Sequence, residues 1–159
     1  MIEQELESRI VAAIRALTVP NLAVVGAWNE QEDETPATVA TLTVVVSPRV
    51  YRRFTVCEAT FPVSLELVAS SAADPAGTAF IAAATAVSDL LHSWNMNKSN
   101  EAKTALAVDG LLSIGGIRVT GGNAPYLDRE SGRRRTSFDF EAVGFIAHNT
   151  NTTNTTQGE

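Results

Sequence analysis

The spacing of apolar side chains between residues 57 and 94 predicts a strand that leads directly into a long helix. Apolar and polar side chains alternate in the first part, which is typical of a strand with one buried face. The buried face of this strand is predicted to carry Phe61, Val63, Leu65 and Leu67. In the second part the apolar residues recur at spacings of three and four, as in a helix that packs on a core. This helical stripe contains Phe80, Ala84, Val87, Leu91 and Trp94.

Asp74 and Pro75 are predicted to begin this helix. The Asp carboxylate can accept hydrogen bonds from the free amides of the first helical turn. Proline fits the first helical position, because no amide donor is needed there. The strand and the helix together are expected to share one core, and that arrangement needs no catalytic residue.

The rest of the chain contains a second amphipathic helix and four further strands. The helix is predicted over residues 2–17, and its glutamates Glu3, Glu5 and Glu7 lie near the positive end of the helix dipole. A short helix is predicted over residues 101–107. The further strands are predicted at residues 22–28, 38–47, 111–120 and 136–146.

These elements predict an α+β fold with a mixed or antiparallel sheet of about five strands and two main helices packed on one face. A chain of 159 residues, 45% of them hydrophobic, suits one domain with a substantial core. We assign residues 1–147 to this domain. Residues 148–159 are rich in Asn and Thr, and we predict that they form a disordered tail because they have nothing to bury.

Charge and composition exclude several classes of function. The net charge of −6 argues against a general or sequence-specific nucleic-acid binder, because phosphate binding requires clustered Lys and Arg in excess. No apolar run follows a basic start, and none approaches about 18 residues, so we expect no signal peptide and no membrane span. The single cysteine cannot form an internal disulfide, which fits a reducing cytoplasm.

The residues that could carry catalysis do not form a convincing set. Asp139 and Glu141 are predicted on one face of a strand, about 7 Å apart, where two carboxylates could share acid and base roles. However, the sequence offers no apolar pocket to raise either pKa, and the arginines at 133–135 lie just upstream to neutralise them. His92 and His148 are too separated in the predicted elements to form a metal pair. We therefore predict no catalytic, cofactor-binding or metal-ligating residue, and we disfavour an enzyme.

Two charged stretches flank the early strands. The first is an acidic loop, which could bind a hard cation but lacks the ligand spacing of a calcium loop, so a solvated connection is favoured. Its carboxylates are Glu30, Glu32, Asp33 and Glu34. The second is basic and contains Arg49, Arg52 and Arg53 beside aromatic residues. Such a patch could hold a single-stranded nucleic acid, but the acidic total favours arginines that pair with carboxylates.

A third charged stretch, Arg133, Arg134 and Arg135, ends a long loop predicted over residues 121–135. Adjacent cations repel one another, so placing them together costs energy unless a partner supplies anions. Another copy of the acidic loop could supply them around a ring. We therefore treat the three charged stretches, with Asp139 and Glu141, as candidate subunit or partner contacts.

Several motifs occur in a characteristic order along the chain. A Glu-rich opening helix at 2–17 is followed by a pair of strands across 38–68, and then by Asp-Pro-x-Gly-x-x-Phe at 74–80. Ala-Val-x-x-Leu-Leu follows at 86–91, and Arg-Arg-Thr-Ser-Phe-Asp-Phe-Glu closes the series at 134–141. This layout resembles the tail-terminator (tail-completion) proteins of tailed bacteriophages. The resemblance covers residues 1–147, and the Asn/Thr-rich tail has no counterpart in it.

The resemblance implies a virion structural protein without a reaction or a cofactor. It implies a ring, usually of six copies, that caps the tail tube, ends tail polymerisation and joins the tail to the head connector. Its partners would be other copies of itself, the tail tube protein and the head–tail connector or neck protein, with room for DNA to pass through the ring. The protein would be assembled in the host cytoplasm and located in the tail or neck of the virion.

Three alternatives remain open from the sequence. A head-closure, neck or other virion ring protein would differ only in the partners that it touches. A small-molecule binding domain would need a large apolar pocket, which the alanine-rich helix is expected to fill. An enzyme would need convergent titratable groups. The mass of the protein in solution separates these classes, because a stable monomer contradicts every ring hypothesis.

Overall fold

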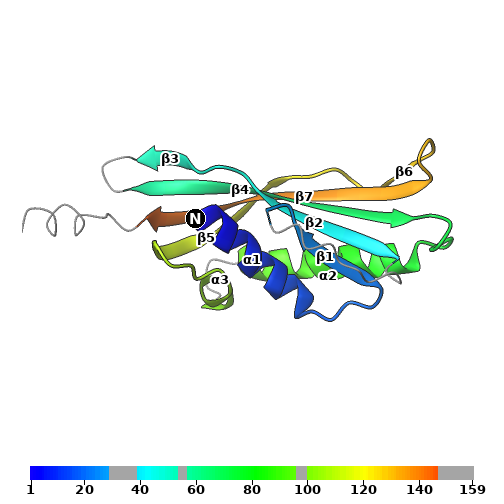
Figure 1. The fold of residues 1–159 in the computed structure, drawn as a ribbon, viewed down its shortest axis with the longest axis horizontal. Coiled ribbons are helices and arrows are strands. Elements are labelled where there is room, and N and C mark those ends of the chain that lie inside the picture. Colours follow the sequence, from blue (N-terminus) through cyan, green and yellow to red (C-terminus); the bar gives the residue numbers. More distant parts are fainter. Residues whose placement is uncertain (29–38, 54–56, 96–99, 147–159) are drawn as a thin grey trace, which may run out of the picture.

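The computed structural model describes residues 1–28, 39–53, 57–95 and 100–146, and it contains one sheet with a layer of helices (Figure 1). The helices are α1 (Ile2–Arg15), α2 (Thr78–Asn95) and α3 (Asn100–Ala105). The strands are β1 (Leu22–Gly26), β2 (Ala40–Val46), β3 (Val50–Arg53), β4 (Glu58–Ser70), β5 (Leu111–Gly121), β6 (Tyr126–Asp128) and β7 (Arg133–Ile146). The predicted acidic loop and the predicted tail lie outside the described residues.

The sheet is mixed and has seven strands. Its main path runs in the order β1-β2-β4-β7-β5, while β3 pairs with β4 and β6 pairs with β7. The β1–β2 pair is parallel, and every other pair is antiparallel. The predicted α+β fold with a mixed sheet is therefore confirmed. The two short strands β3 and β6 were not predicted, and β6 lies within the segment predicted to be a long loop.

The longest strands, β4 and β7, form the central ladder of the sheet. They are paired from Glu58 opposite Phe145 to Ser70 opposite Arg133. Alternation along this ladder directs Phe61, Val63 and Leu65 into the core. The opposite face of the ladder is polar and is not covered by a described helix (Figure 1). Any charged side chain on that face must therefore be satisfied by neighbours on the sheet or by solvent.

The helices lie together on the other face of the sheet, as predicted (Figure 1). The helix α1 packs mainly on β1 and β2, and α2 packs on β4 and β5. Their apolar stripes join the inward side chains of the sheet in one hydrophobic core. None of the helices in the described part of the chain is both long and apolar enough to cross a bilayer.

The start of α2 differs from the prediction. The helix begins at Thr78, and Pro75 lies in the turn before it rather than at the first helical position. Asp74 nevertheless caps the helix from a distance, because its carboxylate accepts hydrogen bonds from the amides of Ala79 (3.3 Å) and Phe80 (3.0 Å). Gly77, with a φ of 73°, supplies the left-handed conformation that connects the turn to the helix.

Candidate functional site

Arg49, one of the predicted contact residues, points toward the interior of the protein and pairs with Glu3. Arg49 donates from Nε to Glu3 Oε1 at 2.5 Å and from Nη2 to Glu3 Oε2 at 2.9 Å. Its guanidinium also lies 5.8 Å from the centre of the Phe61 ring. This hydrogen bonding holds the pKa of the buried Glu3 carboxyl below its usual range, against the opposing effect of burial. Arg49 therefore fastens the start of α1 to the turn between β2 and β3.

The Glu3–Arg49 pair gives a prediction for pH dependence. The pKa of Glu3 is lower in the folded state than its ordinary value of 4.5. The pair therefore stabilises the folded state fully at pH values above 4.5, and this stabilisation is lost as the pH falls through the folded-state pKa. At neutral pH we expect Glu3→Gln to reduce the free energy of unfolding by about 2 kcal/mol. Urea denaturation of both proteins should show that their difference shrinks as the pH falls below about 4.5. A difference that does not depend on pH would contradict this role for the pair.

The polar face of the sheet carries a second group of predicted residues. Asp139 and Glu141 lie on this one face of β7, as predicted, opposite Ser64 and Pro62 of β4. Glu141 pairs with Arg118 Nη2 at 2.7 Å and with Arg52 Nη2 at 3.6 Å. The expectation that the arginines at 133–135 neutralise Glu141 is wrong, because its partners come from β5 and β3.

The three consecutive arginines of β7 do not form one basic patch. The segment is the start of a strand rather than the end of a loop, so Arg133 and Arg135 point to the polar face while Arg134 points to the helix layer. Arg135 pairs with Glu66 at 3.1 Å and with Asp128 at 3.8 Å. Arg133 is exposed and makes no ion pair within the described part of the chain.

Arg134 has a structural role that the sequence did not reveal. It donates from Nη1 to the carbonyl oxygen of Asp74 at 2.5 Å and from Nη2 to that of Pro75 at 2.8 Å. Asp74 also caps α2 with its carboxylate. Arg134 and Asp74 therefore connect β7 with the turn before α2 and with the first turn of that helix. The Asp-Pro-x-Gly segment is therefore in direct contact with the first arginine of the closing motif.

We expect Arg134→Ala to lower the free energy of unfolding by about 2 kcal/mol, because two charge-assisted hydrogen bonds to backbone carbonyls are lost. The neighbouring Arg133→Ala is the matched control, since Arg133 is exposed on the opposite face, and its effect should stay within about 0.5 kcal/mol. Thermal and urea unfolding of both variants provide the measurement. Equal effects of the two substitutions would show that Arg134 does not hold the turn.

The remaining predicted contact residues are placed only in part. Arg52 is half-exposed on β3, on the polar face near Glu141. Arg53 ends β3, where its backbone pairs with Glu58, and its side chain lies outside the described part. The four carboxylates of the acidic loop, Glu30, Glu32, Asp33 and Glu34, also lie outside the described residues.

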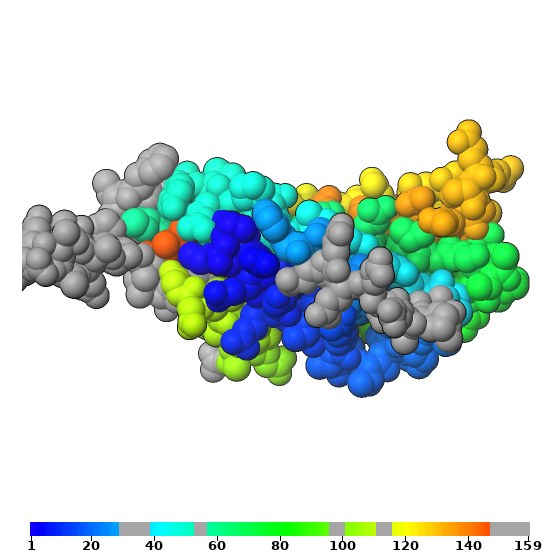
Figure 2. Space-filling model, viewed as in Figure 1, coloured from blue at the N-terminus to red at the C-terminus, as the bar shows by residue number. Residues whose placement is uncertain are grey.

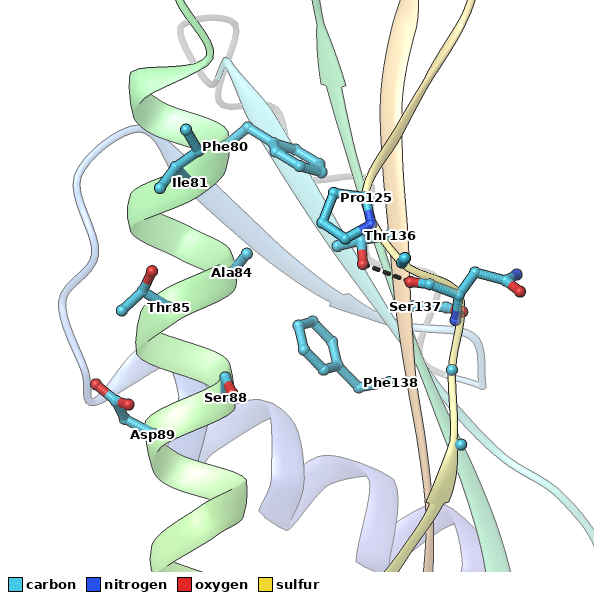
Figure 3. A pocket seen from close by; sticks show the side chains of 14 residues that line it. Phe80, Ile81, Ala84, Thr85, Ser88, Asp89, Pro125, Thr136, Ser137 and Phe138 are labelled. Carbon is cyan, nitrogen blue, oxygen red and sulfur yellow. Dashed lines mark hydrogen bonds between the residues drawn. The ribbon is translucent and has the colours of Figure 1, made fainter.

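A groove lies beside α2 on the described surface (Figure 3). It has a volume of about 510 Å3 and lies between α2, the segment 121–125 and β7. Phe80 of α2 and Phe138 of β7 point into the space between the helix and the sheet (Figure 3). A second hollow of about 250 Å3 continues the groove toward β6 and shares Phe80, Ile81 and Pro125 with it.

The outer wall of the groove is firmly attached to the sheet. The carbonyl oxygen of Asn123 accepts a hydrogen bond from Thr136 Oγ1 at 2.7 Å (Figure 3), and its amide donates to Ser137 Oγ at 2.9 Å. Gly122, with a φ of 138°, passes so close to the Ser137 carbonyl that a Cβ atom there would overlap it. The groove is therefore a preformed feature of the fold.

The lining of the groove combines apolar and small polar side chains with one carboxylate. Its described lining contains one carboxylate, Asp89, and no second acid or base beside it, so it does not offer an acid–base pair. Within the part of the chain that the structure describes, no cluster of His, Cys, Asp and Glu could hold a metal ion. This groove was not predicted, because the alanine-rich helix was expected to fill a large apolar pocket. The one available signal was Ile81, a large apolar residue outside the helical stripe.

Comparison with known proteins supports the fold at low sequence identity. No protein-family model and no curated protein matches the chain. A solved chain from the structure described as "Virion of native gene transfer agent (GTA) particle" has 20% sequence identity and a TM-score of 0.51. The match covers 87% of this chain and 89% of that chain. The two chains therefore share one fold across most of their lengths.

Proposed function

We propose that this protein is a structural component of a virion. The observation that carries the proposal is the fold shared with a chain of the gene transfer agent virion, which extends over 87% of this chain and 89% of the other. The described surface also fits this class, since its groove suits binding and offers no acid–base pair.

Within this class we propose the role of a tail terminator. The protein would form a ring, usually of six copies, that caps the tail tube, ends tail polymerisation and joins the tail to the head connector. Support comes from the resemblance of the motifs at 74–80, 86–91 and 134–141 to those of tail-terminator proteins. In the fold the first and last of these motifs are in contact, because Arg134 donates to the carbonyl oxygens of Asp74 and Pro75.

We also propose that the exposed charged residues make contacts with other subunits or with partner proteins. Arg133 and Arg52 lie on the polar face of the sheet and remain accessible to an anionic partner. The acidic residues Glu30, Glu32, Asp33 and Glu34 are proposed to supply carboxylates for such contacts. Exposed pairs contribute only about 0–1 kcal/mol each, so their role would be to set register and assembly rate.

Electron microscopy of purified tail tubes tests the proposed role. We expect tubes mixed with the protein to carry a ring at one end and to stop growing when more tube protein is added. A ring found on the head connector but never on the tube would indicate a head-closure or neck protein instead. Tubes that stay bare and continue to grow would contradict the tail-terminator role.

A further inference from the structure

The hollow that continues the groove beside α2 is bordered by an unusual set of exposed apolar side chains. Ile81 is 60% exposed, Tyr126 is 50% exposed and Leu127 is 48% exposed, and all three line this hollow. Pro125 and Phe80 complete its apolar surface. Adjacent exposed apolar residues around a concave surface are typical of a site that a partner covers. We call this surface the α2–β6 groove, taken together with the larger hollow that includes Asp89.

A second exposed apolar group lies at the other end of the molecule. The strand β3 carries Val50, which is 48% exposed, and Tyr51, which is 40% exposed. The molecule is elongated, and β3 and β6 lie near opposite ends of its long axis (Figure 1). In the space-filling view, the segment around β6 projects from the surface at one end of the long axis of the molecule (Figure 2). The chain thus presents a concave apolar surface at one end and an apolar strand at the other.

We propose that the α2–β6 groove binds β3 of a neighbouring copy of this chain. This inference rests on the proposed function, because a ring requires each subunit to offer two different surfaces that fit each other head to tail. A groove at one end and a strand at the other meet this requirement, whereas a single patch would pair only with itself. The four-residue β3 is short, and its described pairing is with β4 alone, so it has one edge left for a neighbour.

The two surfaces carry one pair of opposite charges, Asp89 in the groove and Arg52 on β3, while Arg134 of the groove donates to backbone carbonyls of its own chain. Asp89 is the only Asp, Glu, Lys or Arg residue of α2, it lines the groove, and it makes no ion pair with any described residue. Arg52 stands next to Tyr51 on β3, is half-exposed, and is held only loosely by Glu141 at 3.6 Å. When β3 of one copy enters the groove of the next, Arg52 supplies Asp89 with a cation that no described residue of its own chain provides.

Other surfaces of the sheet are less suited to this contact. The short edge strand β1 is already engaged, since Arg15 donates to the carbonyl oxygen of Val24 at 2.7 Å and 3.2 Å. On the polar face, Glu141 pairs with Arg118, and Glu66 pairs with Arg135. The α2–β6 groove combines exposed apolar side chains with Asp89, which makes no ion pair with a described residue.

The first test compares two adjacent positions of α2 by sedimentation velocity of the full chain. Ile81→Glu should weaken association by about tenfold or more, because it places a charge in the apolar contact. Ala82→Glu is the matched control, since Ala82 is exposed on the same helix but does not line the groove. Circular dichroism should show both variants folded. Equal association of the two variants would overturn the inference.

The second test reverses the proposed ion pair. Asp89→Arg and Arg52→Asp should each weaken association, and the double variant should regain it, because the opposite charges then face each other again. Absence of this recovery would overturn the inference. If the wild type forms rings that neither the Ile81 nor the charge variants weaken, the inference fails while the proposed function stands. If the wild type never associates, alone or with tail tubes, both fail.

Discussion

Replacement of Leu91 by aspartate is expected to abolish folding of the protein. Leu91 lies in the middle of the apolar face of α2 and is only 3% exposed. A carboxylate at this position would be buried without a partner, which costs several kcal/mol. The whole stability of such a domain is about 5–15 kcal/mol, so one substitution removes a large part of it.

Circular dichroism and thermal unfolding of Leu91→Asp provide the measurement. The matched control is Ala82→Asp, which introduces the same side chain at an exposed position of the same helix. We expect the control to remain folded, with a loss of only about 0.5–1 kcal/mol from the lower helix propensity of aspartate. A soluble Leu91 variant with the melting temperature of the wild type would show that this face of α2 is not part of the core.

Replacement of Gly26 by alanine is expected to destabilise the protein by about 3 kcal/mol. Gly26 ends β1 where the fully buried carboxylate of Glu7 passes, and an added methyl group would overlap Glu7 Oε1. That oxygen accepts a hydrogen bond from the amide of Trp28 at 2.8 Å. The methyl group would therefore displace a buried carboxylate from its hydrogen-bonding partner.

Two comparisons isolate this effect in urea denaturation. Gly121→Ala is the matched control, because a Cβ atom at Gly121 would have nothing within 4 Å, and it should be neutral or slightly stabilising. In a Glu7→Ala background, Gly26→Ala should cost much less than in the wild type, because the group that it overlaps is gone. Additive effects of the two substitutions would mean that the close approach of Gly26 and Glu7 is not what makes glycine necessary.

The long elements could be predicted from the sequence because their own periodicity determines which face is buried. The stripe of α2 is an example, since Phe80, Val87 and Trp94 are all buried as predicted. The short strands β3 and β6 could not be predicted in this way. They have four and three residues, and their extended conformation depends on pairing with the long strands β4 and β7 rather than on any alternation of their own.

The charged residues show why the candidate site was predicted less well. Glu3 and Glu7 were expected to lie near the positive end of the helix dipole, and the sequence did not show that both would be buried. Their partners, Arg49 and the amide of Trp28, are distant in the sequence and are brought close only by the fold. Arg134 was similarly assigned to a basic loop, because the last strand was predicted to begin at residue 136. In the structure β7 begins at Arg133, so successive arginines point to opposite faces of the sheet.

The groove could not be predicted because it is formed by separate segments of the chain. Its lining comes from α2, from the connection between β5 and β6, and from β7, which become neighbours through sheet pairing. Tyr126 and Leu127 belong to a stretch that was predicted to be a loop. Two successive large apolar residues in a loop have no helical or strand periodicity from which their burial could be predicted. Their exposure is the feature that a partner surface explains.

Sedimentation velocity of the wild-type chain, alone and with purified tail tubes, tests the central claim most directly. We expect a closed oligomer whose mass is a small multiple of the 16.9 kDa of one chain, about six times that mass, either free or bound to the tubes. A chain that stays at the mass of one copy in both conditions would contradict the ring, and with it the proposed role in the virion.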